Sequence, residues 1–134
     1  MWVSALLNPS GGPAQVLRHL AEQRYTLLMS EPLLDELAAV LARPRLVRKY
    51  GISQADILEL RAMLQAQSEE VKVRGDLKIC RDPDDDIVIE TALLGSADAL
   101  VTRDDDLKGS SDVVAALTEV GVAVLSVRQF LAAL

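Results

Sequence analysis

The chain has 134 residues, half of them apolar, which matches the size and composition of one globular domain and excludes a disordered chain. Its net charge of −6 argues against nucleic-acid binding through a broad basic face, and its single cysteine, Cys80, excludes an internal disulfide. Because no apolar run reaches the roughly 20 residues of a membrane span and the start is a poor signal peptide, we expect a cytoplasmic protein without membrane contact.

The first half of the chain predicts helices interrupted by one short strand. Pro13 is favourable in the first turn of a helix, Ser30 and Ser53 are typical N-cap residues, and Gly51 is typical of a helix end. The predicted elements are a helix over 13–24, a buried strand over 25–30, a helix over 31–43, a basic helical turn over 45–51 and a helix over 54–70. The apolar stripe expected on the last helix consists of Leu58, Met63 and Leu64.

The second half begins with an extended or looped segment over 71–80 and then alternates helices with strands. Asp84 or Asp85 is expected to cap a helix over 86–96, which Gly95 closes. The remaining predicted elements are a strand over 98–102, a loop over 103–111, a helix over 112–121, a strand over 122–126 and a helix over 127–134. This alternation predicts an α/β fold with a parallel sheet covered on both faces, although only three convincing strands emerge.

Four acidic residues fall where the strands of such a sheet end. Glu36 lies on the first turns of the helix after strand 25–30, Asp86 begins the helix that leads into strand 98–102, and Asp104 and Asp106 follow that strand. Open α/β sheets bind ligands at the carboxyl ends of their strands, so these carboxylates could converge on one edge. Two carboxylates about 5 Å apart repel by roughly 3 kcal/mol at an effective dielectric of 20, which a raised pKa or a divalent cation would relieve.

Oxygen ligands alone suit Mg²⁺ or Mn²⁺, and one histidine with one cysteine makes a zinc site improbable. A cation held by carboxylates keeps water molecules, and activation of one of them is a route to phosphodiester hydrolysis. The segment does not fit a calcium-binding EF-hand, because Ile87 stands where that loop needs glycine and Leu93 where it needs glutamate.

Simpler interpretations stay open for each feature taken alone. Aspartates before a helix are commonly caps, and acidic loops are commonly just solvated. The basic segment with Arg43, Arg45, Arg48 and Lys49 could hold RNA phosphates, or it could be a solvated helix end whose charges suit the helix dipole.

The segment "CRDPDDDIVIETALLGSADALVTRDDDL" (80–107) resembles the second half of a PIN-domain ribonuclease, in particular the toxins of bacterial toxin–antitoxin systems. The segment "SEPLLDELAAVLARPRL" (30–46) resembles the stretch that carries the family's glutamate. The resemblance covers essentially the whole chain, and it implies a single PIN-like domain over 1–134 with a three-layer α/β/α sandwich and a mostly parallel sheet. It also implies RNA cleavage that depends on Mg²⁺ or Mn²⁺.

By this resemblance, Glu36, Asp86 and Asp104 are the metal ligands and catalytic acids, and Asp106 is a supporting or fourth catalytic acid. Thr102 matches the hydroxyl position that helps to orient the acids. The resemblance further implies an RNA substrate, an antitoxin protein that blocks the site, and a homodimer.

The start of the chain departs from the family pattern. The family begins with a strand that ends in an Asp-Thr-Asn-Val-like motif, and Met1 stands about where the valine should be. The first central strand and its aspartate are therefore expected to be absent, through a start codon assigned too far downstream or through a genuine truncation. In the second case, the alternative function is a catalytically defective PIN-like module that binds an antitoxin or RNA without cleaving it.

Overall fold

The structure is a computed structural model that describes residues 11–79, 83–102 and 111–134. The chain divides into two compact units, Met1–Glu70 and Val71–Leu134. The first unit contains α2 (Gly12–Ala21), β1 (Leu27–Met29), α3 (Glu31–Leu41), α4 (Pro44–Tyr50), α5 (Gln54–Gln67) and β2 (Ser68–Glu70). The second contains α6 (Pro83–Leu94), β3 (Ala99–Val101), α8 (Ser111–Glu119), β4 (Ala123–Leu125) and α9 (Val127–Ala133).

Each unit is built around one pair of parallel strands. In the first unit β1 pairs with β2, so that Leu27 lies opposite Ser68, and in the second unit β3 pairs with β4, so that Ala99 lies opposite Ala123. Parallel neighbours require a crossover connection, which α3, α4 and α5 supply between β1 and β2. The predicted α/β class with parallel strands is confirmed, as are all three predicted strands.

The fourth strand, β2, was predicted wrongly as the end of a helix over 54–70. Helix α5 stops at Gln67, and Ser68 adopts an extended backbone with φ −115° and ψ 161°. The next residues pair with β1, where Glu69 lies opposite Leu28. Serine and glutamate are poor strand formers, so pairing with β1 overrides the local preference, which a sequence pattern does not contain.

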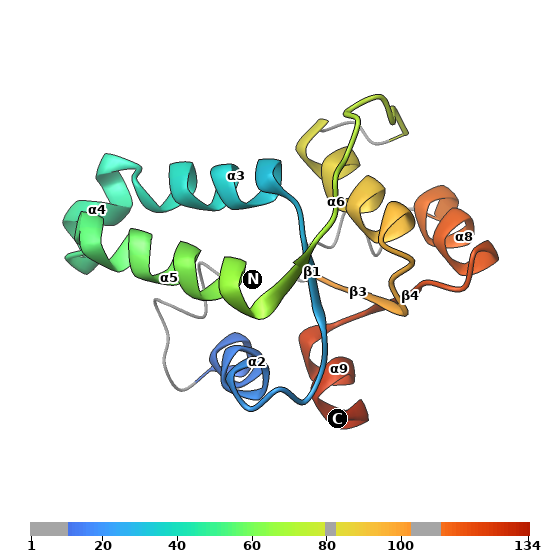
Figure 1. The fold of residues 1–134 in the computed structure, drawn as a ribbon, viewed down its shortest axis with the longest axis horizontal. Coiled ribbons are helices and arrows are strands. Elements are labelled where there is room, and N and C mark those ends of the chain that lie inside the picture. Colours follow the sequence, from blue (N-terminus) through green and yellow to red (C-terminus); the bar gives the residue numbers. More distant parts are fainter. Residues whose placement is uncertain (1–10, 80–82, 103–110) are drawn as a thin grey trace. The chain divides into compact units, whose positions relative to one another are not determined.

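The apolar core of the first unit joins its helices to β1. Figure 1 shows α3 and α5 side by side, connected through α4. The buried face of α5 consists of Ile57, Leu60 and Leu64. Leu58 is 58% exposed, so its place in the predicted apolar stripe was wrong. The buried members of this core are Leu20, Met29, Leu34, Leu37, Leu41, Ile52, Ile57, Leu60 and Leu64.

The predicted end of α4 and the predicted start of α5 are confirmed by their terminal contacts. Gly51 has φ +64°, the left-handed conformation that ends α4 at little cost for glycine. Two residues later, Ser53 and Asp56 form a capping box: the Asp56 N–H donates to Ser53 Oγ at 3.0 Å, and the Ser53 N–H donates to Asp56 Oδ2 at 2.9 Å. Strong local signals of this kind place helix ends well.

The second unit has its own smaller core, formed by α6, α8 and the residue just before β4. Its buried members are Ile89, Ala92, Val113, Leu117 and Val122. Helix α6 begins at Pro83, so the expected caps Asp84 and Asp85 lie inside its first turn. It is closed by Ser96, which has φ +54°, rather than by Gly95, and the N–H of Ala97 donates to the Ala92 carbonyl there at 3.0 Å.

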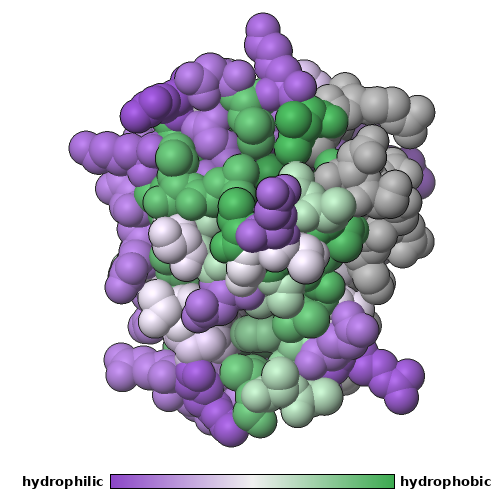
Figure 2. Space-filling model, turned by 90° about the vertical axis from the view of Figure 1, so that its right-hand side faces the viewer, coloured by the Kyte–Doolittle hydropathy of each residue, from purple (hydrophilic) through white to green (hydrophobic). Residues whose placement is uncertain are grey.

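The surface mixes polar and apolar side chains. On the face drawn in Figure 2, apolar side chains reach the surface at several places between polar ones. Within the described ranges, no helix combines the length and the apolar character that crossing a membrane requires. Residues 1–10 lie outside the described residues, and the expectation that the first strand and its aspartate are missing stays a prediction.

The two leucines on α5 give a matched test of the first unit's core. Leu64 is fully buried and Leu58 is 58% exposed, so Leu64→Ala should lower the free energy of unfolding by about 2–5 kcal/mol, because it leaves a cavity. Leu58→Ala, the same change on the same helix, should alter it by no more than about 0.5 kcal/mol. Urea unfolding measures both, and equal losses would contradict the observed orientation of α5.

Candidate active site

Helix α6 buries two carboxylates on successive turns. Asp86 is 6% exposed and Glu90 is 5% exposed, and their spacing of four residues places them on one face of the helix. A buried carboxylate is costly unless hydrogen bonds or an opposite charge compensate for it. The contacts of these two residues therefore decide how this helix is held.

Asp86 lies in the first turns of α6 and is held by the segment before the helix. Its Oδ1 accepts a hydrogen bond from the backbone N–H of Ile79 at 2.9 Å. The start of a helix also favours a negative charge, because its backbone N–H groups point toward that end. One oxygen of Asp86 thus has a fixed direction relative to the segment 71–79.

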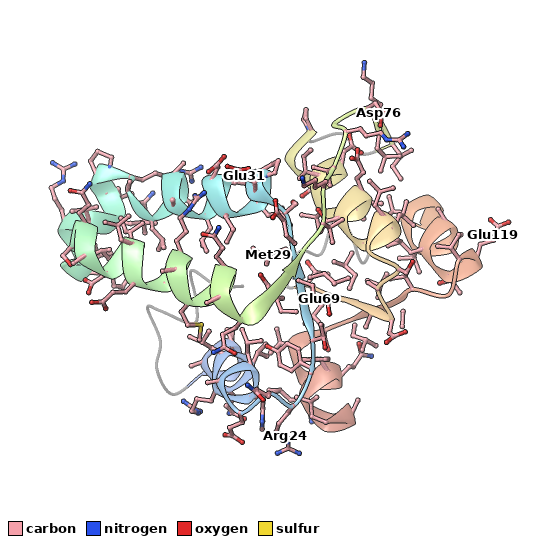
Figure 3. The ribbon with its side chains drawn as sticks, in the orientation of Figure 1. Arg24, Met29, Glu31, Glu69, Asp76 and Glu119 are labelled. Atoms are coloured by element: carbon pink, nitrogen blue, oxygen red, sulfur yellow. The ribbon has the colours of Figure 1, made fainter. Side chains whose placement is uncertain are left out.

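Glu90 accepts hydrogen bonds from two consecutive backbone amides of the same segment. The N–H of Arg74 donates to Oε2, and the N–H of Gly75 lies 3.1 Å from Oε1 and 3.2 Å from Oε2. Gly75 has φ +77°, which turns neighbouring N–H groups toward one point, as in an anion-binding nest. Figure 3 labels the next residue, Asp76, on this segment.

Two opposing effects act on the pKa of Glu90. Burial raises the pKa, while hydrogen bonds from the backbone amides of Arg74, Gly75, Leu77 and Asp76 lower it. The hydrogen bonds prevail, so the pKa of Glu90 lies below its ordinary value. Glu90 is therefore ionised at neutral pH, and backbone N–H groups compensate its charge.

The other predicted acids lie in different parts of the chain. Glu36 is half-buried on α3, in the first unit, next to Asp35, whose Oδ1 pairs with Arg61 Nη2 of α5 at 2.7 Å. Asp104 and Asp106 lie outside the described residues. Because Glu36 and Asp86 belong to different units, their convergence with Asp104 stays a prediction from the sequence.

Thr102, the predicted orienting hydroxyl, directly follows β3. Its backbone N–H donates to the Leu125 carbonyl at 3.0 Å, which extends the pairing of β3 with β4 by one further hydrogen bond. The position of Thr102 at the carboxyl end of a parallel strand is as predicted. Its hydroxyl role stays a prediction.

Helix α4 carries the predicted RNA-contacting cations. Arg43 stands at its N-cap, and Arg45, Arg48 and Lys49 follow on the helix, all with exposed side chains. Lys49 Nζ lies 5.3 Å from the centroid of the Tyr50 ring, a cation–π distance. This exposed, positively charged helix contrasts with the net negative charge of the chain.

The predicted acids can be tested against the ligands that a divalent cation prefers. Within the described part of the chain, no group of three or more His, Cys, Asp and Glu side chains is placed to hold a metal ion. Asp86 is the one predicted acid within the described residues of the second unit. It is buried, and its carboxylate oxygens are hard donors that suit Mg²⁺ or Mn²⁺. The oxygen donors of Asp86 suit the cation, and the ligand roles of Glu36 and Asp104 stay predictions from the sequence.

The family model of the PIN domain matches residues 1–106 of the chain. The chain belongs to the PIN-domain family. Over 107 residues, it is 30% identical to an uncharacterized protein of Methanocaldococcus jannaschii, an alignment that covers 80% of this chain and 68% of the archaeal protein. No solved structure matches it significantly.

PIN domains are generally nucleases, and they generally use divalent metals. The region matched by the PIN domain contains Glu36, Asp86, Thr102, Asp104 and Asp106, which are all the acids and the hydroxyl predicted for the site. The α/β fold class is that of the family, with helices and short parallel strands.

Sequence reasoning missed Glu90. The signal was present, since Glu90 is the one charged residue in the otherwise apolar or neutral segment 87–94 and lies four residues after Asp86. Its partners are the backbone amides of residues 74 and 75, and a backbone amide cannot be predicted as a partner from residue type. The sequence therefore marks Glu90 as a charge one helical turn after the predicted metal ligand Asp86, whereas its burial and its hydrogen bonds are seen only in the structure.

Removal of the charge from Glu90 tests whether the backbone amides that compensate this charge stabilise the unit. Glu90→Gln should lower the free energy of unfolding at pH 7 by about 1–3 kcal/mol, because the N–H donors of Arg74 and Gly75 lose a charged acceptor. The pKa of Glu90 is lowered in the folded chain, so its stabilisation is present above the ordinary glutamate pKa of about 4.3 and is lost as the pH falls below that value.

Urea unfolding at pH 7 and at pH 3.5 measures this effect. The difference between Glu90→Gln and the wild type should shrink at the lower pH. The matched control is Glu119→Gln, at the exposed end of α8 (Figure 3), which should leave stability nearly unchanged at both pH values. A loss that is equally large at both pH values would show that the charge of Glu90 is not what stabilises the unit.

Proposed function

We propose that the chain is a metal-dependent endoribonuclease and the toxin of a toxin–antitoxin pair. The observation that carries the proposal is the PIN-domain match over residues 1–106, which contains Glu36, Asp86, Asp104 and Asp106. Asp86 is buried in the first turns of α6 and accepts the Ile79 N–H, so its carboxylate has the defined direction that the proposed role requires.

In this proposal Glu36, Asp86 and Asp104 hold Mg²⁺ or Mn²⁺, and Asp106 assists them. The bound cation would supply an activated water and charge stabilisation at the scissile phosphate. The Ile79 N–H fixes one oxygen of Asp86, and the Thr102 hydroxyl helps to orient the acids. Hydrolysis by a positioned water needs no covalent intermediate on the protein.

RNA would be held in part by the exposed cations of α4. Phosphate contacts position a nucleic acid and carry no sequence information, which suits flexible side chains such as Arg45, Arg48 and Lys49. An exposed aromatic ring beside them, that of Tyr50, could stack on an unpaired base. The toxin role, the antitoxin partner and the homodimer are supported by the sequence resemblance.

The substitution Asp86→Asn tests the catalytic assignment. Asparagine keeps an oxygen that can accept the Ile79 N–H, so the fold should survive, while the lost charge weakens the cation site. RNA cleavage in Mn²⁺ should fall about 100-fold or more, because metal catalysis supplies several kcal/mol of transition-state stabilisation.

Asp98→Asn, on an exposed side chain of the same unit, is the matched control and should cleave RNA at the wild-type rate. Cleavage should be followed together with Mn²⁺ binding. Equal activity of Asp86→Asn and the wild type would contradict the assignment. A wild-type chain that neither binds Mn²⁺ nor cleaves RNA would favour the defective module that binds an antitoxin or RNA.

The basic helix gives a separate test through salt dependence. The double variant Arg45→Ala, Arg48→Ala should bind single-stranded RNA more weakly, and its affinity should fall less steeply with salt, by about 0.7 in the logarithmic slope for each phosphate that the variant no longer neutralises. Mn²⁺ affinity should not change. Arg128→Ala, an exposed change on α9, is the control, and an unchanged slope in the double variant would exclude α4 from the RNA site.

A further inference from the structure

We propose that Glu90 is a positioning residue for Asp86 and acts through the segment 74–79. The inference rests on the proposed function, since it concerns the acid expected to bind the cation. It adds to that function a residue whose side chain holds the backbone that orients the ligand.

The first step is the attachment of the segment to α6 at two points. Glu90 accepts the amides of Arg74 and Gly75, and Asp86 accepts the amide of Ile79. The acceptors lie about one helical turn apart on a single helix, and the donors lie at the two ends of the segment. The segment is therefore fixed to the helix at both ends.

The second step is the dependence of one attachment on the other. Ile79 contributes a backbone N–H to Asp86, and its own side chain is exposed, so apolar packing does little to hold it. Leu77 packs against the core of the unit between the two attachments, and the end of the segment at Arg74 and Gly75 is held against α6 by the buried, ionised carboxylate of Glu90. Without that charge the segment would move more freely, and the amide at Ile79 would no longer define the direction of the Asp86 carboxylate.

The third step concerns the consequence for a bound cation. Residues that orient a metal ligand without touching the metal usually change its affinity about 10–100-fold when they are replaced. Glu90 is suited to this role, because both of its carboxylate oxygens accept backbone amides of the segment. Its effect should reach the cation through the Ile79 N–H.

A conformational variant can loosen the segment without altering a carboxylate. Gly75 has φ +77°, where nothing lies within 4 Å of an added Cβ, so only backbone conformation opposes a side chain there. Alanine strongly disfavours this conformation, whereas asparagine adopts it more readily. Gly75→Ala should therefore imitate Glu90→Gln, and Gly75→Asn should behave more like the wild type.

The experiment compares these variants in two measurements on the full chain. In the metal-free protein, hydrogen exchange at the Ile79 amide should become at least about tenfold faster in Glu90→Gln and in Gly75→Ala. Mn²⁺ affinity, measured by the electron paramagnetic resonance signal of free Mn²⁺, should weaken about 10–100-fold in the same two variants. Val113→Ala, a buried change on α8 in the same unit, controls for lost stability and should leave both quantities unchanged while the chain is folded.

The outcomes separate the positioning role from the function. If the wild type binds Mn²⁺ and Asp86→Asn does not, but Glu90→Gln keeps wild-type affinity and slow exchange at Ile79, the positioning role is overturned and the function stands. If Val113→Ala weakens Mn²⁺ binding as much as Glu90→Gln does, Glu90 acts only through stability and the role is likewise overturned. If the wild type binds no Mn²⁺, the proposed function fails, and the positioning role fails with it.

Discussion

The compensation of buried negative charge on α6 is the constraint on which the second unit depends. The buried carboxyl groups of Asp86 and Glu90 need hydrogen-bond partners away from water, and the backbone amides of residues 74, 75 and 79 supply them. The same hydrogen bonds attach a segment without regular structure to a helix whose other face lies in the apolar core. Electrostatics and packing thus determine the position of the helix together.

The described acids of the predicted site and the exposed cations of α4 lie in different elements of the chain. Among the described acids that the PIN domain would use, Glu36 lies within α3 and Asp86 in the first turns of α6, while exposed positive charge collects on α4. A chain with net charge −6 repels RNA at long range, so a bound divalent cation and a local basic helix would both be needed to bring a phosphate near the carboxylates.

Local chemistry determined what could be predicted from the sequence. The Ser53 cap and the left-handed Gly51 were correctly located, because their signals lie within a few residues. Strand β2 and the exposure of Leu58 were missed, since both depend on pairing or packing with residues distant in the chain. Of the candidate site, the acids were recognisable by residue type, but the role of Glu90 was not, because its partners are backbone amides.

The parallel pairing of β1 with β2 has a consequence for how the first unit forms. The two strands are only three residues each, and residues 30–67 lie between them. The strands cannot pair until that long connection is closed, which costs chain entropy before any strand hydrogen bond is gained. Helices α3 and α5 contact one another and shorten the gap, so their association should precede strand pairing in the folding transition state. The short sheet would then be the last part of this unit to assemble and the first to open.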